Sequence, residues 1–240
     1  MIVLPTERYA QAAPLFSSYD YHQGHFGSVL TGMNPGRVFV DRDERPRSAA
    51  LLPDEGFLYL AGEASGAFVA ELAARLRDED AECVEAFWAD SAWSALVPAL
   101  SPDGKSVTLT RMLYRLPAGD TPSGAAAARA LAPGEGLELR VESSPGRLAA
   151  RLTREGRALS SCSAWVYGGQ AEMDIETAEE ERGKGYARLA AGAFLAECAR
   201  LGLEPQWNCW DFRQESNALA ERLGFRLKRK QPAFLWDKWL

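Results

Sequence analysis

Glu181-Arg182-Gly183-Lys184-Gly185-Tyr186-Ala187 is the stretch of this 240-residue sequence that decides the fold. It stands between a predicted strand, Ala171–Thr177, and a predicted helix, Gly185–Leu201. Its two glycines allow a tight turn and let main-chain N–H groups approach a ligand without interference from a Cβ atom. The first N–H groups of a helix lack internal partners and lie at the positive end of its dipole, so a diphosphate is a natural occupant of such a turn.

Two other phosphate-binding patterns do not fit this stretch. A Walker A loop requires Gly-Lys-Ser/Thr at its end, and none is present. The dinucleotide pattern G-x-G-x-x-G fails because Arg188 occupies the third glycine position, and the 53 residues after Ala187 are too few for the second half of a doubly wound fold. An ordinary turn between a strand and a helix stays open as the alternative.

The segment Arg182-x-x-Gly185-x-Ala187 resembles the R/Q-x-x-G-x-G/A loop of the GNAT acetyltransferase superfamily. The preceding strand is similar to that family's fourth strand, and Leu223-Gly224-Phe225 is similar to the common end of its fourth helix. The resemblance covers about residues 137–240. A narrower resemblance, to a bacterial GNAT subfamily with an extra N-terminal domain, rests on segments 38–41, 174–177, 202–207 and 219–225.

This resemblance implies an α/β fold with a mixed sheet and an N-acetyltransferase that moves the acetyl group of acetyl-CoA directly to a primary amine. The loop amides would hold the CoA pyrophosphate, and Thr177 with its neighbours would hydrogen-bond the pantetheine arm and polarise the acetyl carbonyl. The start of the fourth helix would lie beside the cofactor. The residues thereby predicted to contact acetyl-CoA are Ile175, Thr177, Arg182, Gly183, Lys184, Gly185, Tyr186, Ala187, Arg213, Ser216 and Asn217.

Three carboxylates, Glu172, Asp174 and Glu176, alternate along the predicted strand and project from one face. Acidic residues are depleted in strands, so the pattern is unusual. We predict that Glu176, the nearest to the loop, accepts the proton of the amine directly or through water. A solvent-facing surface or an amine-binding rim is the alternative.

Two positions depart from the family pattern. Many members carry a tyrosine four residues before the glycine of Leu-Gly-Phe, to protonate the departing thiolate, and Ala220 stands there. Arg213 stands where many carry asparagine. Another group such as Tyr186 or a water would then serve, or the thiolate leaves unassisted, or activity is lost. A non-catalytic regulatory module that binds acyl-CoA is therefore the second hypothesis, and a protein–protein adaptor is the third.

Other conspicuous residues have structural interpretations. On the helix Gly185–Leu201, the predicted buried stripe is Tyr186, Leu189, Ala190, Ala193, Phe194 and Leu201. Glu197 falls within this stripe and is expected to form an ion pair rather than to act in catalysis. Tryptophans 207, 210, 236 and 239 are expected in the core, with an acceptor pocket as the alternative. His22 and His25 are expected in a surface turn.

The chain is predicted to form two domains, 1–118 and 125–240, joined by a linker at 118–124. Before the linker we predict strands at 37–41, 49–52, 57–61, 83–88 and 106–116, and helices at 65–77 and 91–100. After it come a short Ala-rich helix at 125–131, strands at 137–141, 148–153, 157–167, 171–177 and 205–210, a helix at 214–223, and closing strands at 225–230 and 233–239. Both halves follow a similar order, which suggests that the first is a degenerate GNAT-like unit without its cofactor loop. A chance match of short α/β units is the alternative.

The composition of the sequence limits the kinds of binding partner that we expect. The net charge is −6, with −7 in residues 1–120 and +1 in residues 121–240, which argues against nucleic acid. The sequence has no secretory pattern and no apolar run of about 20 residues, so we expect a cytoplasmic protein without a membrane partner. The four cysteines are spaced as free, mostly buried thiols, and no metal is expected. The expected acceptor is a small-molecule or peptide amine; a homodimer is compatible with the sequence, which does not fix the oligomeric state.

Overall fold

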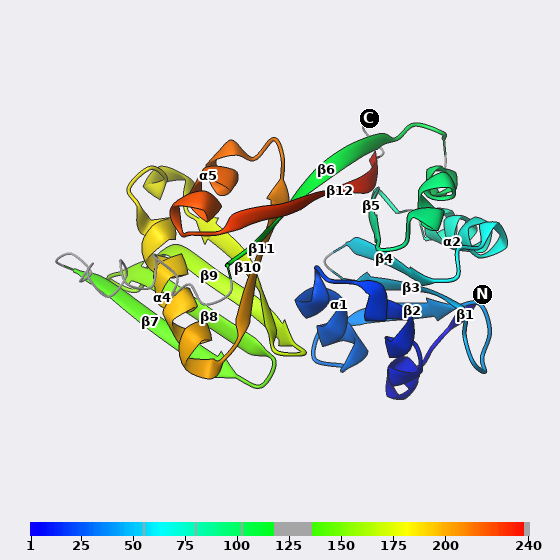
Figure 1. The fold of residues 1–240 in the computed structure, drawn as a ribbon, viewed down its shortest axis with the longest axis horizontal. Helices are drawn as coiled ribbons and strands as arrows, with labels where there is room; N and C mark the ends of the chain where they lie inside the picture. Colours follow the sequence, from blue (N-terminus) through cyan, green and yellow to red (C-terminus); the bar gives the residue numbers. More distant parts are fainter. Residues whose placement is uncertain (55, 80, 102, 118–135, 238–240) are drawn as a thin grey trace. The chain divides into compact units, whose positions relative to one another are not determined.

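The computed structural model describes residues 1–54, 56–79, 81–101, 103–117 and 136–237 (Figure 1). The chain forms two compact units, the first of Met1–Arg111 with Gln231–Leu240 and the second of Met112–Lys230. Strands β6 (Val107–Arg115) and β12 (Arg226–Asp237) each contribute residues to both units. The predicted linker at 118–124 and the predicted helix at 125–131 lie outside the described residues, and the domain limits 1–118 and 125–240 stay predictions.

Unit 1 is a mixed sheet in the order β1-β2-β3-β4-β5-β12. Strands β4 and β5 are parallel, and the pairs β1/β2, β2/β3, β3/β4 and β5/β12 are antiparallel. Its strands are β1 (Ile2–Val3), β2 (Gly36–Val40), β3 (Ser48–Pro53), β4 (Phe57–Gly62) and β5 (Cys83–Trp88). Its helices are η1 (Thr6–Gln11), η2 (Ala13–Ser18), α1 (Gln23–Leu30), α2 (Gly66–Asp78), η3 (Ser91–Ala95) and η4 (Val97–Leu100).

The core of unit 1 forms between its sheet and α2. Apolar residues three and four apart give this helix one buried face: Phe68, Val69, Leu72, Ala73 and Leu76. These side chains join Trp93 and Trp236 in one hydrophobic cluster. Residues from the C-terminal end of the chain therefore complete the N-terminal core.

Unit 2 is a mixed sheet in the order β6-β11-β10-β9-β8-β7. Its further strands are β7 (Leu137–Ser144), β8 (Arg147–Arg154), β9 (Arg157–Tyr167), β10 (Gln170–Thr177) and β11 (Glu204–Trp210). Its helices are η5 (Glu179–Glu181), α4 (Tyr186–Leu201) and α5 (Gln214–Arg222). Helix α4 packs across β8 and β9, as Figure 1 shows, so the turn that starts it is fixed to a rigid sheet.

The buried stripe of α4 differs from the predicted one. Its buried residues are Ala190, Ala191, Gly192, Phe194, Leu195 and Cys198. Leu201 is 39% exposed, so the stripe is rotated by about one residue from the predicted face. Glu197 consequently lies at its edge, where both carboxylate oxygens accept hydrogen bonds from Arg200 at 2.7 and 2.9 Å. The expected ion pair is confirmed.

Two further element predictions are wrong. Residues 91–100 form two short 3₁₀ helices, η3 and η4, instead of one α-helix. Pro98 has no N–H to donate to an α-helical ladder, which favours the short form. The two predicted closing strands are one continuous strand, β12, because Pro232 is tolerated in its extended backbone.

The histidine pair is also placed differently from the prediction. His22 is fully buried at the start of α1, with its ring 4.6 Å from that of Phe87 and 5.6 Å from that of Tyr59. It adopts a left-handed backbone (φ 56°), which histidine tolerates better than most residues. The surface turn predicted for His22 and His25 is therefore replaced by an aromatic core cluster, formed by residues far apart in sequence.

Among the tryptophans, Trp207 and Trp236 are buried as expected, whereas Trp239 lies outside the described residues. Three cysteines are buried, and Cys83 is exposed. None of the helices in the described part of the chain is both long and apolar enough to cross a membrane.

The place of β12 in the core of unit 1 gives a testable expectation. Trp236 is buried and donates a hydrogen bond from Nε1 to Asp103 at 3.0 Å. Trp236→Ala should destabilise unit 1 by about 3 kcal/mol or more, because it leaves a large cavity. Hydrogen–deuterium exchange should accelerate in β5 of this variant and stay unchanged in β8 and β9. Leu227→Ala, at an exposed site on the same strand, is the control. Equal acceleration in both units would contradict the assignment.

Candidate functional site

The turn between η5 and α4 has the backbone geometry expected of an anion-binding loop. Gly183 and Gly185 have φ values of 78° and 82°, in the left-handed region that favours glycine. A Cβ atom built on either glycine would meet no atom within 4 Å. The glycines are therefore required by the backbone conformation and not by packing against the protein, and the space in front of the turn is open.

The amide groups of this turn are available to a ligand. The N–H of Arg182 donates to the carbonyl of Glu179 at 3.2 Å, and the N–H of Arg188 donates to the carbonyl of Gly185 at 3.1 Å. Between them, the N–H groups of Gly183–Ala187 have no acceptor among the residues that the structure describes. Within the described part of the chain, no side chain caps the start of α4. Five consecutive donors thus lie at the positive end of a helix of 16 residues.

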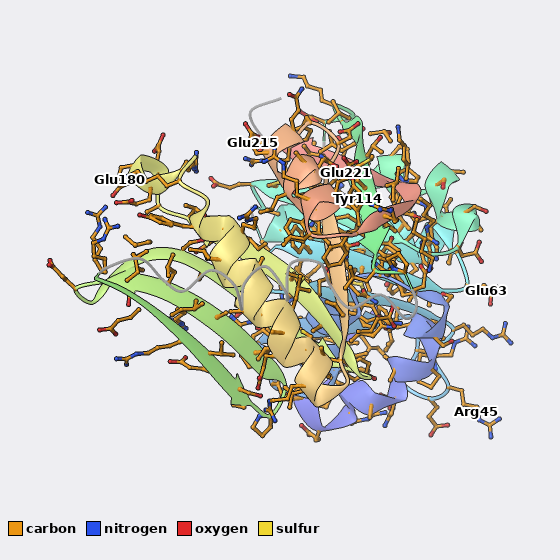
Figure 2. All side chains as sticks on the ribbon, turned by 60° about the vertical axis from the view of Figure 1, so that its left-hand side comes forward. Arg45, Glu63, Tyr114, Glu180, Glu215 and Glu221 are labelled. Carbon is orange, nitrogen blue, oxygen red and sulfur yellow. The ribbon has the colours of Figure 1, made fainter. Side chains whose placement is uncertain are left out.

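The two basic side chains of the loop are in different situations. Lys184 Nζ donates to Oε2 of the buried Glu181 at 2.8 Å, and this hydrogen bond is the main cause that lowers the pKa of Glu181. Arg157 pairs with Glu180, which Figure 2 labels beside the same turn, and so holds η5 against β9. Arg182 is exposed and has no ion-pair partner among the described residues. Lys184 therefore fixes the turn, while Arg182 stays available to an anion.

Strands β10 and β11 separate beside this loop. Their parallel pairing covers Gln170↔Glu204, Ala171↔Pro205 and Glu172↔Gln206, and no later pair is recorded for these fully described strands. Strand β10 nevertheless continues to Thr177 and stays paired with β9 along its whole length. The edge of β10 from Met173 to Thr177 is therefore no longer covered by β11.

The direction of the main-chain groups follows from two hydrogen bonds. The N–H of Ala178, just after β10, donates to the carbonyl of Leu159 in β9, and the N–H of Glu204 donates to the carbonyl of Gly169, just before β10. Because successive residues of a strand direct their amides to opposite sides, even-numbered residues face β9 and odd-numbered residues face β11. The main-chain groups of Ile175 and Thr177 consequently point to the uncovered side. This edge can pair with an extended amide-bearing chain.

The side chain of Thr177 is held in place at the end of this edge. Its hydroxyl lies 2.9 Å from that of Ser160, which also donates to the carbonyl of Glu176 at 2.8 Å. Ser160 is buried in β9, so these two contacts fix the end of β10 to its neighbouring strand. The site therefore has a rigid edge that leads into the amide-bearing loop.

The three carboxylates of β10 differ in burial. Met173 and Ile175 pack into the core that contains α4, so the alternating acidic residues occupy the opposite face. Glu172 is 3% exposed, and its Oε1 accepts a hydrogen bond from Asn208 Nδ2 at 2.8 Å. Asp174 and Glu176 are exposed. The predicted base is thus accessible at the open end of the strand, while Glu172 lies at the point where the strands separate.

Two residues of β11 beside Glu172 were not recognised from the sequence. Asn208 bridges Glu172 and Arg115, whose Nη1 lies 3.3 Å from Asn208 Oδ1. Gln206 is 1% exposed, and neither polar atom of its side chain has a hydrogen-bond partner among the described residues. Buried amides are normally bonded, so a water or a ligand group is expected at Gln206. The sequence signal was the alternation of Gln206 and Asn208 with Trp207 and Cys209.

The polar side chains at the start of α5 form hydrogen bonds within the protein. Ser216 Oγ accepts a hydrogen bond from Trp207 Nε1 at 3.2 Å. Asn217 Oδ1 accepts one from Tyr114 Oη at 2.7 Å, and its Nδ2 donates to the carbonyl of Arg213 at 2.8 Å. Tyr114, labelled beside α5 in Figure 2, comes from β6 and was not foreseen. Contact of these α5 side chains with a cofactor stays a prediction.

Three positions bear on which group could protonate a departing thiolate: Ala220, Tyr186 and Tyr114. Ala220 is fully buried in the core and has no hydroxyl. The hydroxyl of Tyr186 accepts a hydrogen bond from Arg154 Nη2 at 2.8 Å. The hydroxyl of Tyr114 donates to Asn217, and burial raises its pKa.

In unit 1, β4, α2 and β5 form a strand–helix–strand arrangement that corresponds to β10, α4 and β11 of unit 2. It differs in the pairing of its strands and in the cap of its helix. Strands β4 and β5 pair from Phe57↔Glu85 to Leu60↔Trp88, and β5 ends at this last pair. The side chain of Ser65 accepts from the N–H of Phe68 and caps α2. A Cβ atom at Gly62 would lie 2.0 Å from the carbonyl oxygen of Arg47, so this turn packs on its own unit. Unit 1 thus lacks both the separated strands and the uncapped loop.

Comparisons with known proteins agree with this geometry. A family model described as GNAT acetyltransferase matches residues 151–234. An N-acetyltransferase of Bacillus subtilis, YdfB, itself uncharacterised, is 27% identical over 221 residues, which is 83% of this chain and 85% of the relative.

Two solved structures share the fold. The GCN5-related N-acetyltransferase-like protein from Streptococcus suis has a TM-score of 0.71 at 22% identity and covers 96% of this chain and 98% of its own. A tandem GNAT protein from the clavulanic acid biosynthesis pathway has a TM-score of 0.64 at 13% identity. The match covers 99% of this chain and 98% of that protein.

Residues 151–234 match the GNAT acetyltransferase model, and the comparisons together support an acyltransferase of the GNAT type. The predicted resemblance to GNAT acetyltransferases is thereby confirmed, as is the mixed α/β fold, whereas the role of the loop Arg182–Ala187 stays a prediction. Members of this family use acetyl-CoA as co-substrate.

A matched pair of glycines tests the loop. Gly185 and Gly202 stand at the two ends of α4, both with left-handed backbones and both with open space at the Cβ position. Alanine at either site should cost about 1 kcal/mol or more of backbone strain. Only Gly185→Ala should also weaken coenzyme A binding, by about tenfold or more, because the loop amides move. Calorimetry with coenzyme A measures this. Equal affinities in the two variants would rule out the loop.

Proposed function

We propose that the protein transfers the acetyl group of acetyl-CoA to a primary amine, with the cofactor bound on unit 2. The observation that carries the proposal is the run of five unbonded N–H groups at Gly183–Ala187. A diphosphate offers the acceptor oxygens that these donors lack. Exposed Arg182 adds a positive charge on the same turn.

The uncovered edge of β10 supports the placement of the rest of the cofactor. The pantetheine arm carries two amides, and the main-chain groups of Ile175 and Thr177 point to the side from which such an arm would pair with the strand. Bound acetyl-CoA would supply a thioester as the activated acyl group. The N–H groups of β10 would orient the thioester carbonyl and stabilise the charge that develops on its oxygen.

Glu176 is the proposed proton acceptor. Its carboxylate is exposed on the face opposite α4, one residue before Thr177. An amine that attacked the thioester carbonyl from this face would form a C–N bond and would have to lose a proton, which a carboxylate within hydrogen-bond reach can take directly or through one water. The C–S bond would then break, which leaves the acetyl group on the amine as an amide and releases coenzyme A as a thiolate that takes up a proton from solvent. Glu172 and Asn208, at the base of the same face, would orient the amine. We expect the acceptor to be a small-molecule or peptide amine.

A thiol-release assay over pooled amines, amino acids and peptides tests this function. Glu176→Gln should lower kcat by about a hundredfold or more, because the amide cannot accept a proton, and should leave the affinity for coenzyme A unchanged. Asp174→Asn removes the neighbouring exposed carboxylate of the same face and is the matched control. It should retain most of the activity.

The outcomes separate the alternatives. Unchanged turnover in Glu176→Gln would remove Glu176 from the role of base, and a larger loss in Glu172→Gln would transfer that role to Glu172. Binding of coenzyme A without thiol release from any amine would favour the non-catalytic regulatory module, which none of the comparisons supports.

A further inference from the structure

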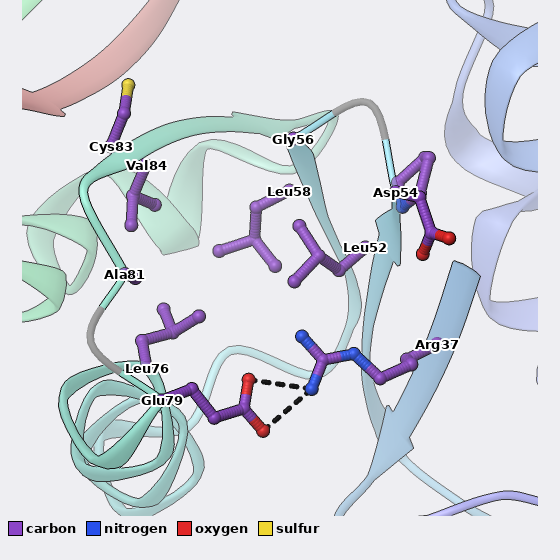
Figure 3. Close-up of a pocket in the computed structure, with 11 residues that line it drawn as sticks. Arg37, Leu52, Asp54, Gly56, Leu58, Leu76, Glu79, Ala81, Cys83 and Val84 are labelled. Carbon is purple, nitrogen blue, oxygen red and sulfur yellow. Dashed lines mark hydrogen bonds and ion pairs between the residues drawn. The ribbon is translucent and has the colours of Figure 1, made fainter. Parts of the chain in front are cut away.

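Unit 1 contains a cavity of about 280 Å³ that the proposed transferase function does not use (Figure 3). It lies at the ends of four strands, β2 to β5, and beside the last turn of α2. Its floor is apolar, from Leu52, Leu58 and Leu76. The volume is at the lower limit of about 300 Å³ for pockets that bind small molecules, so the occupant must be small.

One side of this cavity carries a guanidinium group. Arg37 Nη1 donates to both carboxylate oxygens of Glu79 at 2.6 and 2.7 Å, and Arg75 Nε donates to the same carboxylate. These hydrogen bonds lower the pKa of the Glu79 carboxyl, and the bond from Arg37 has the largest effect. Two arginines thus share one carboxylate and leave a positive charge beside the cavity. The Asp54 carboxylate, in the turn just after β3, points away from it in Figure 3.

The remaining donors of Arg37 are directed at the cavity. Nε and Nη2 donate to no acceptor among the described residues. In Figure 3, the guanidinium nitrogen that does not bond Glu79 points toward Leu52 and Leu76. A guanidinium edge next to an apolar surface is the arrangement that binds a carboxylate attached to a hydrocarbon chain.

We propose that this cavity binds a small aliphatic carboxylate, whose carboxylate group pairs with Arg37 and whose hydrocarbon chain packs on Leu52, Leu58 and Leu76. The pairing uses donors that have no other acceptor among the described residues, so it breaks none of the hydrogen bonds formed by these residues. The apolar chain gains roughly 0.8 kcal/mol for each methylene it buries. The lining belongs entirely to unit 1, whereas the loop Gly183–Ala187 belongs to unit 2. Binding is therefore independent of the transferase site.

Cys83 provides a direct measure of occupancy. It lines the cavity and is the exposed member of the four cysteines. Burial of its surroundings raises the pKa of its thiol to about 11, so alkylation by iodoacetamide is slow and should be followed at a pH of about 9. The full-length protein is used, without coenzyme A, and mass spectrometry reports modification at Cys83.

Hexanoate is the probe, and hexylamine, with the same chain and the opposite charge, is the control ligand. Hexanoate should slow the alkylation of Cys83 by about fivefold or more, with half of the effect below about 1 mM, and hexylamine should not. Arg37→Gln should abolish this protection. Arg47→Gln, which changes an exposed arginine of the same unit, should retain it. Arg37→Lys, which keeps the charge but loses the planar fork, should weaken protection.

Several results would overturn the proposal. These are no protection by hexanoate, half of the effect only above about 10 mM, equal protection by hexylamine, or full protection in Arg37→Gln. Because no cofactor or acceptor amine is present in this assay, a failure here leaves the transferase function untouched. Loss of acetyl transfer would likewise not affect the outcome at Cys83.

Discussion

The separation of β10 from β11 after the pair Glu172↔Gln206 is the constraint on which the rest of unit 2 depends. Two parallel strands that stayed paired to their ends would use every main-chain donor and acceptor between them. Here β10 stays paired with β9 along its whole length while β11 separates from it. The main-chain N–H and C=O groups on the β11 side of β10 are therefore not used by β11, although the strand stays ordered. The helix that follows β10 then starts beside this edge, without a side-chain cap. A ligand with both amides and a diphosphate satisfies both features at once.

The same arrangement in unit 1 shows what changes when this constraint is absent. Strands β4 and β5 remain paired up to Trp88, and Ser65 caps the helix between them. Unit 1 therefore differs from unit 2 at this place by a serine cap on its helix and by a strand β5 that ends with its last pair to β4. This is consistent with the interpretation of unit 1 as a degenerate GNAT-like unit.

Local features of this protein could be predicted from its sequence, whereas features that depend on distant contacts could not. The loop at Gly183 and Gly185 and the ends of α4 follow from glycine conformations and helix dipoles, which are local properties. The burial of His22 depends on Phe87 and Tyr59, which are remote in sequence. The continuity of β12 depends on a partner strand about 150 residues earlier, about which local propensity says nothing. Likewise, the roles of Asn208 and Gln206 became visible only from the register of β11 with β10.

The account's central claim is that the amides of Gly183–Ala187 are the donors for a diphosphate. A crystal structure with coenzyme A tests it most directly. We expect diphosphate oxygens within about 3 Å of several of these nitrogen atoms, and the pantetheine arm along the edge of β10 at Ile175 and Thr177. Coenzyme A bound elsewhere, or an unchanged turn whose amides bond to the protein itself, would contradict the account.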